Sequence, residues 1–226
     1  MRPLIIMNGE KIDWFHTVIR MLMYLAGVAV LALGMSLQTA SGLGVVALTC
    51  FATTLSMLTG KTLGFWITAT YVAYIVAQFA ILRREFQPRI LLELCFSTLI
   101  GGFTDFFMAV NPLHPAALPI QVETMLLSLA VTAFGVSLVV NMGVVPNAPD
   151  GLVQVIAEKI KRRFGDVKVV FDCSHVAVSL VLSLALMHNL GGFGVTTAIS
   201  ALFLGHVINI ANKLSAQRFV RAAFGK

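Results

Sequence analysis

Ionisable side chains within apolar stretches are the residues of this sequence that are best suited to chemistry. Asp172 and His175, in "VVFDCSHVAVSL", stand three positions apart and therefore share one face of a helix. His206 and Asn209, in "LFLGHVINIANKL", have the same spacing near the end of another apolar stretch. Ionisable groups inside transmembrane helices are costly and usually face a cavity or a partner. These four residues therefore predict a polar cavity that binds a small-molecule substrate.

The stretch "NMGVVPNAPDGL" (141–152) adds a third polar segment to the same region. Its Asn147, Asp150 and Gly151 lie where prolines and a glycine would end one helix and start another. We expect Asp150 to be the N-cap of the second helix, because its carboxylate would accept from the free N–H groups of the first turn. A helix N-terminus also attracts anions, so a cap and a substrate site are compatible.

Each of these residues also has a purely structural interpretation. His206 can reach the membrane interface from its helix end, and Asp172 with His175 can form a structural pair or complement the helix dipole. Asp172, Cys173, His175 and His206 lack a standard ligand spacing, so we expect no metal site and no cofactor. Since histidine changes charge near neutral pH, proton coupling is a weaker alternative role for the two histidines.

The elements that must position these residues follow from composition. The chain has 226 residues, of which 58% are hydrophobic and 12% charged, with a mean hydropathy of +0.90, whereas soluble domains are about a quarter charged. A helix needs roughly 20 apolar residues to cross a bilayer. The runs of that length predict six spans, at 17–38, 62–82, 90–109, 125–145, 167–187 and 191–211.

The basic residues orient these spans. Lysine and arginine collect in cytoplasmic loops. With six crossings and both termini in the cytoplasm, 15 of the 16 basic residues fall on the inner side, and Lys61 is the exception. Arg20 is expected to anchor the first span at that face. Membrane topology accounts for the net charge of +6, so we exclude nucleic acid as a partner and expect anionic lipid at Lys159, Lys161, Arg162 and Arg163.

The segment 42–58 and an internal repeat define the expected architecture. Counting 42–58 as a crossing would place the "RREFQPR" loop outside, so we expect a short helix or re-entrant segment packed inside the protein. "GMSLQTASGLGVVA" (34–47) matches "GVSLVVNMGVVPNA" (135–148) at an offset of 101 residues. Three crossings per half would invert the second copy. The predicted fold is therefore an all-α polytopic membrane protein of six transmembrane helices and two short broken segments, arranged as two inverted three-helix repeats.

The predicted organisation has five parts. A cytoplasmic N-terminal segment precedes the first repeat, which an extracytoplasmic loop joins to the second repeat and its broken amphipathic segment 146–165; a cytoplasmic basic tail follows. These parts span 1–16, 17–110, 111–124, 125–212 and 213–226. The first repeat supplies Ser41 and Thr49 as candidate substrate contacts. Its Asp105 is either an interfacial acid bonded to Thr104 or to a neighbouring helix, or part of an outer gate.

At the level of these motifs the chain resembles the YczE/YyaS/YitT-type bacterial integral membrane proteins. The residues that carry the resemblance are "GMSLQTASGLGV", "GVSLVVNMGVVPNAPDGL" and "LIGGFTDFF". The first copy lacks the proline and aspartate of the second, with "VVALT" where the second has "PNAPD". The resemblance implies a compact multi-helix protein of a bacterial cytoplasmic membrane, without a settled biochemical activity.

The leading functional hypothesis is a small secondary transporter or permease, because inverted repeats with interrupted helices are typical of that class. A membrane scaffold or regulator, or a substrate-capturing subunit of a larger complex, is the alternative. The motifs GxxxxGK[ST], HExxH and GxSxG are absent, so we expect neither ATP hydrolysis nor an enzyme. The size of the chain suggests a homodimer.

Overall fold

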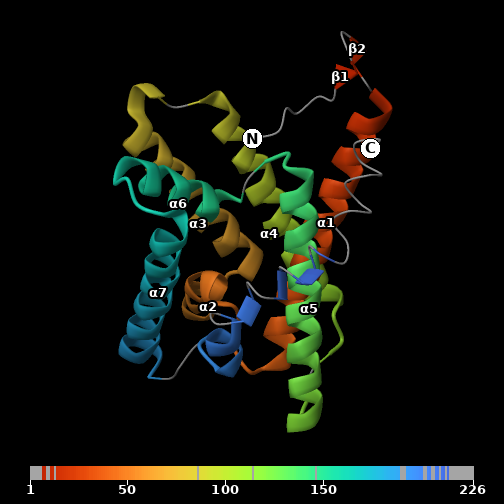
Figure 1. Ribbon diagram of the computed structural model, residues 1–226. Coiled ribbons are helices and arrows are strands. Elements are labelled where there is room, and N and C mark those ends of the chain that lie inside the picture. The colour runs from red at the N-terminus through yellow and green to blue at the C-terminus, as the bar shows by residue number, and fades with distance from the viewer. Residues whose placement is uncertain are drawn as a thin grey trace.

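The computed structural model describes residues 7–8, 11–12, 14–85, 87–113, 115–145, 147–188, 192–200, 203–204, 207–208, 210–211 and 213. A small hairpin of β1 (Met7–Asn8) and β2 (Lys11–Ile12) precedes the helices. The chain then forms α1 (Trp14–Ser41), α2 (Ala47–Thr59), α3 (Leu63–Leu82), η1 (Arg83–Glu85), η2 (Pro88–Leu91), α4 (Leu92–Val110), α5 (Leu118–Met142), α6 (Ala148–Lys159), α7 (Phe164–Leu182) and η3 (Ser183–Met187) (Figure 1).

Five of these helices are long and apolar enough to cross a membrane, which indicates a multi-pass membrane protein. They cover Trp14–Ser41, Leu63–Glu85, Leu92–Val110, Leu118–Met142 and Phe164–Met187. The predicted sixth span, 191–211, is described only in part, with helix at 195–200 and in short pieces beyond it. α5 begins before the predicted start at 125, because a proline in its first turn opens the helix.

The helices α1 and α5 lie side by side and run in opposite directions, α1 downward and α5 upward in the view of Figure 1. Glycines on both helices bring α1 and α5 close together. A Cβ on Gly34 would lie 2.8 Å from the Thr132 backbone nitrogen, and one on Gly135 would lie 2.5 Å from that of Leu31. Gln38 Nε2 donates to Thr132 Oγ1 across the same contact at 3.1 Å. Small residues permit such close helix packing in membranes.

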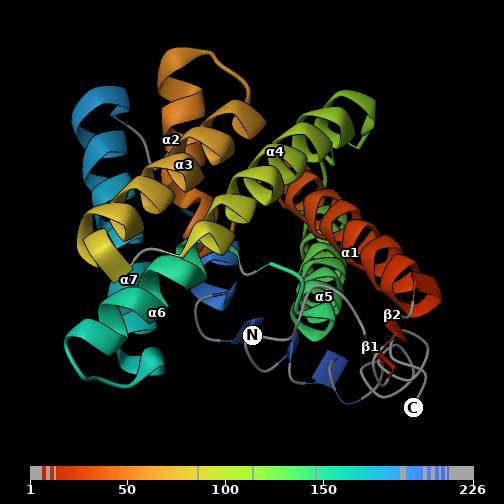
Figure 2. The ribbon, with the colours of Figure 1, turned by 90° about the horizontal axis from the view of Figure 1, so that it is seen from above.

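The two short helices α2 and α6 lie toward opposite ends of the molecule, α6 above and α2 below in Figure 1, and each packs against both α3 and α7. Glycines in the left-handed conformation precede them, Gly42 (φ 70°) after α1 and Gly143 (φ 56°) after α5. Such glycines end helices without steric cost. Seen from above, α3 and α4 lie over the central part of the molecule (Figure 2).

The expected anchoring role of Arg20 is wrong, because its side chain is fully buried. Its Nε donates to the Met142 carbonyl at 2.7 Å and its Nη2 to the Gly143 carbonyl at 2.8 Å. The last carbonyls of a helix have no partner within that helix. Arg20 therefore ties α1 to the end of α5 and fixes the chain where it turns toward α6.

Candidate functional site

Three charged residues join α6 to α7. Lys168 Nζ lies 3.0 Å from Asp150 Oδ1 and 3.0 Å from Asp172 Oδ1. The side chains are between 25% and 40% exposed. Because Lys168 and Asp172 are one helical turn apart, α7 itself holds this pair in place, and α6 brings the second carboxylate to the same ammonium group. Lys168 is one of the 15 basic residues used above to orient the spans, and its place between the two acids was not predicted.

Asp150 is not the N-cap of α6. The helix begins at Ala148 with Asn147 in the N-cap position, and no side chain makes a capping hydrogen bond there. Pro149 lies in the first turn, where a proline costs no hydrogen bond, so the helix starts earlier than expected. Asp150 is thus an acid within the first turn, which the helix dipole stabilises. Gly151 follows it with its face toward α3 and α4.

A hydrogen bond between Tyr74 of α3 and His175 of α7 lies near the middle of these helices. The Tyr74 hydroxyl is 2.6 Å from His175 Nε2, and His175 Nδ1 is 2.8 Å from the Phe171 carbonyl. Because a carbonyl only accepts, Nδ1 carries a proton and donates to the Phe171 carbonyl. The two contacts together orient the imidazole of His175 between α3 and the backbone of α7. The sequence predicted His175 but not its tyrosine partner.

A small cavity lies beside this pair. It has a volume of about 100 Å³ and is lined by Phe51, Ser174, His175 and Val178. Phe51 belongs to α2 and the other three to α7. The ring of Phe51 meets that of His175 edge-on, with centroids 6.2 Å apart. The imidazole thus has a hydrogen-bonded side toward α3 and an apolar side toward the cavity.

A second buried polar pair, Glu93 of α4 and Gln78 of α3, was not predicted. Both side chains are 1% exposed, and Gln78 Nε2 donates to Glu93 Oε2 at 2.7 Å. Gly151 lies against the carboxylate, since a Cβ there would be 2.7 Å from Glu93 Oε1. The signal was present in the sequence: Gln78 and Glu93 lie inside the predicted spans 62–82 and 90–109, where polar side chains are unusual.

The other predicted residues lie elsewhere. The Ser41 hydroxyl donates to the Gln38 carbonyl at 2.7 Å and that of Thr49 to the Val46 carbonyl at 3.1 Å. Both therefore bond to backbone near the start of α2, away from α6. His206 and Asn209 lie outside the described residues.

Asp105 bonds to a neighbouring helix rather than to Thr104, whose hydroxyl donates to the Ile100 carbonyl at 2.7 Å. Asp105 Oδ2 accepts from Thr62 Oγ1 and Oδ1 from the Gly64 backbone N–H, each at 2.7 Å. These contacts cap the start of α3 from the side of α4.

Besides the contact of Phe51 with His175, α2 and α7 are joined by hydrogen bonds of hydroxyl groups. Thr54 Oγ1 lies 2.7 Å from Ser179 Oγ and 3.2 Å from Ser183 Oγ. Ser179 Oγ also donates to the Cys50 carbonyl at 3.1 Å. All four residues are buried. Hydroxyls can bond to each other and to helix backbone, so this packing needs no charge.

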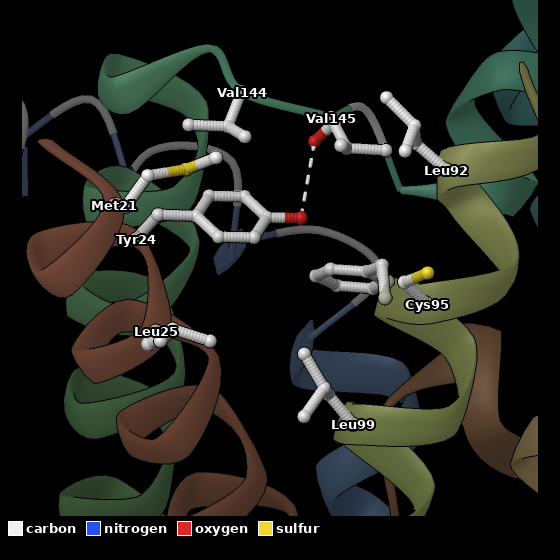
Figure 3. A pocket seen from close by; sticks show the side chains of 9 residues that line it. Met21, Tyr24, Leu25, Leu92, Cys95, Leu99, Val144 and Val145 are labelled. Carbon is white, nitrogen blue, oxygen red and sulfur yellow. Dashed lines mark hydrogen bonds between the residues drawn. The ribbon is translucent and has the colours of Figure 1, made fainter. Parts of the chain in front are cut away.

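A larger cavity, of about 290 Å³, lies between α1 and α4 beneath the chain that leads to α6 (Figure 3). Its walls are apolar apart from the Tyr24 hydroxyl, which donates to the Val145 carbonyl at 3.5 Å. The lining is Met21, Tyr24, Leu25, Leu92, Cys95, Phe96, Leu99, Val144 and Val145. This crevice is therefore almost entirely apolar, whereas the charged and hydrogen-bonded side chains described above lie on α3, α4, α6 and α7.

The basic residues after α6 are exposed, and Lys159 Nζ lies 3.0 Å from Glu85 Oε2 of η1. Among the residues that the structure describes, no group of three or more His, Cys, Asp and Glu side chains is placed to hold a metal ion.

A family model described as a family of unknown function (DUF6198) matches residues 18–213. Neither the comparison with curated proteins nor that with solved structures gave a match. The matched range contains every helix of the candidate site.

Proposed function

Because the chain belongs to the DUF6198 family, whose function is unknown, we propose a function from the geometry of its own residues: a small secondary transporter that alternates access between two inverted halves. The observation that carries the proposal is the 2.6 Å hydrogen bond between Tyr74 and His175. These positions are 101 residues apart, which is also the offset of the sequence repeat. The bond therefore joins equivalent positions of the two halves.

The contact between α1 and α5 supports the same symmetry. Gly34 packs on Thr132, and Gly135 packs on Leu31. Adding 101 to residues 34 and 31 gives residues 135 and 132, so each contact becomes the other when the halves exchange places. Such reciprocal contacts support the proposed repeat, which rests otherwise on short matching segments of the sequence.

The contacts of the two short helices are also reciprocal. Gln78 of α3 lies against Gly151 of α6, and Ser179 of α7 bonds to Cys50 of α2. Adding 101 to residues 78 and 50 gives residues 179 and 151, so the contact of 78 with 151 corresponds to that of 179 with 50. The opposite directions of α1 and α5, and the opposite ends taken by α2 and α6, are what inverted halves require. Transporters built this way bind substrate near the repeat interface, beside interrupted helices.

We place the substrate at the Tyr74–His175 pair, in the cavity that Phe51 closes on one side. A volume of about 100 Å³ holds about three waters at roughly 30 Å³ each, so loading a metabolite requires α2 to move away from α7. We assign the selection for charge to Asp150, Lys168 and Asp172, which join α6 to α7. Asn147 and Gly151, at the start of α6, remain candidate contacts in this proposal.

The proposal includes the orientation. The α6 side faces the cytoplasm, together with both termini, and residues 191–211 complete six spans in a bacterial cytoplasmic membrane. Lys161, Arg162 and Arg163 then meet anionic lipid. Kinship with the YczE/YyaS/YitT-type proteins and assembly as a homodimer belong to the same proposal.

The test begins with a thermal-shift screen of the purified protein against small metabolites, followed by uptake of each hit into reconstituted vesicles. Tyr74→Phe removes the hydroxyl that forms the hydrogen bond with His175 without removing the ring. Losing a hydrogen bond of about 1 to 1.5 kcal/mol should lower affinity by up to roughly tenfold. His175→Gln should impair uptake more strongly, since it also removes the imidazole that lines the cavity.

Val170→Ala is the matched control, because Val170 is on α7 but 69% exposed; it should leave uptake unchanged. If no metabolite stabilises the protein, and the Tyr74→Phe and His175→Gln chains fully complement a deletion strain, transport is excluded. A scaffolding or regulatory role would then replace it.

A further inference from the structure

The buried pair of Glu93 and Gln78 has no part in the proposed substrate site. Gln78 Nε2 donates to Glu93 Oε2 at 2.7 Å and to the Ala148 carbonyl at 3.4 Å. Because the Ala148 carbonyl can only accept a hydrogen bond, the amide of Gln78 is oriented with its nitrogen toward Ala148 and Glu93. Gln78 thus connects the carboxyl group of α4 to the first residue of α6.

The helix α6 covers this carboxyl group directly. A Cβ on Gly151 would lie 2.7 Å from Glu93 Oε1 and 3.1 Å from Oε2. Only the absence of a side chain lets the backbone of α6 rest on both oxygens. Water can therefore reach Glu93 from this side only when α6 moves away.

Burial is the main factor that disfavours a negative charge on Glu93, whose side chain is 1% exposed. From α3 the Gln78 amide donates to it, which favours the carboxylate in part, but among the residues that the structure describes no cation forms an ion pair with it. From α6 the carboxylate of Asp150 interacts with it unfavourably, and from α1 the neutral hydroxyl of Tyr24 is within electrostatic range. Arg20 of α1 donates to the carbonyls that end α5, and Lys168 of α7 lies between two other acids. A carboxylate in such surroundings is costly, and a bound proton removes the cost.

We infer that Glu93 is the proton-binding group of this protein: it holds a proton while α6 is closed over it and releases the proton to water when α6 opens. This inference rests on the proposed transport function, for which it supplies the coupling ion. A metal cation fits less well, because Gly151 leaves no room for a coordination shell and Gln78 presents a donor. Protonation thereby becomes coupled to the position of α6.

The first experiment uses the native chain in detergent and the reagent dicyclohexylcarbodiimide, which reacts with protonated carboxyl groups in apolar sites. Peptide mass spectrometry should find Glu93 modified, less so as the pH rises, and equally in sodium and choline chloride. Glu158, an exposed acid of α6, is the control and should remain unmodified. Failure to modify Glu93 at any pH, or its protection by sodium, would overturn the inference.

The second experiment tests the link to α6 in a chain whose three native cysteines are replaced. Val153 is fully buried on α6, so labelling of Val153→Cys by a thiol reagent reports the opening of α6. Labelling of Gln154→Cys, at an exposed position, corrects for the change of thiol reactivity with pH. The closed state binds the proton, so opening should increase with pH. One coupled proton gives at most about tenfold per pH unit in the labelling ratio. In Glu93→Gln the ratio should be low and independent of pH.

Equal pH dependence in the two chains would contradict the inference even if Glu93 is modified. Neither measurement needs a substrate. If both succeed and no solute is transported, the proposed function fails while the proton-linked movement of α6 stands. If uptake is found but Glu93 stays unmodified, the transport proposal stands and the inference fails.

Discussion

The α6 end and the α2 end of this molecule use the same packing with different chemistry. Each has one short helix that rests on α3 and α7. At the α6 end the contacts include Glu93 and an ammonium group, Lys168, between two carboxylates. At the α2 end the hydrogen bonds between side chains are made by hydroxyls, Thr54 with Ser179 of α7 and Ser183 of η3.

The two ends therefore differ in how their buried polar groups are satisfied. A hydroxyl is both donor and acceptor and can be satisfied by its own helix, as Thr53 is by the Thr49 carbonyl at 2.9 Å. A buried carboxylate needs a cation, a donor or a proton. We therefore expect the α6 end to respond to pH and salt, and the α2 end to behave as a neutral seal. Three predictions compare the two ends, beginning with the largest expected effect.

The first compares Gly151→Ala on α6 with Cys50→Ala on α2, two positions 101 residues apart. A methyl group at 151 would press on Glu93 and Gln78, so we expect a loss of about 1–3 kcal/mol in the free energy of unfolding. Cys50→Ala removes one buried sulfur and its contact with Ser179, at a cost of about 1 kcal/mol. Denaturant unfolding in detergent measures both.

A control strengthens this comparison. A Cβ at Gly165 would meet nothing within 4 Å, so Gly165→Ala should not destabilise the protein. If Gly151→Ala costs no more than this control, then α6 does not rest on Glu93 as described.

The second prediction compares Lys168→Met with Thr54→Val. The first leaves Asp150 and Asp172 facing each other; because these side chains are 40% and 30% exposed, solvent screening limits the cost to about 1 kcal/mol. Thr54→Val should cost about 1 kcal/mol through its lost hydrogen bonds. Only the cost of Lys168→Met should shrink as salt increases, which unfolding at low and high ionic strength will show. Equal salt dependence would remove the contrast between the ends.

The smallest effect is expected for Asp105→Asn. Asp105 caps the start of α3 through Thr62 and the Gly64 N–H, and an amide can replace one of these two acceptors. We expect a cost of about 0.5–1 kcal/mol without loss of uptake. A selective loss of uptake at unchanged stability would restore the outer-gate interpretation of Asp105.

Several elements could be predicted because their signals are local. Long apolar runs predicted the first five spans. The charge of "RREFQPR" kept the segment 42–58 from being counted as a crossing, and in the structure the thirteen-residue helix α2 (Ala47–Thr59) covers most of that segment. Boundaries were less predictable. α5 starts at Leu118 and α6 at Ala148 because prolines in their first turns extend the helices toward the N-terminus.

The candidate site was predictable only in part. Asp172 and His175 stand out as polar residues in an apolar run, and the structure gives each a partner, Lys168 and Tyr74. Neither partner could be identified by local pattern, since a lysine near a helix start and a tyrosine within a span are ordinary features of membrane proteins. Glu93 also lies inside a predicted span, 90–109, but the sequence gives no sign of its partner Gln78 on another helix.

The sequence by itself determined that this is a helical membrane protein, because hydropathy and helix length are properties of consecutive residues. It also contained two short segments, 34–47 and 135–148, that match at an offset of 101 residues. Only the tertiary structure decided which residues meet: Tyr74 with His175, Lys168 between two acids, and Gly151 upon Glu93. Those contacts depend on how α3, α4, α6 and α7 pack, and packing joins residues too far apart in the chain for any local pattern to specify.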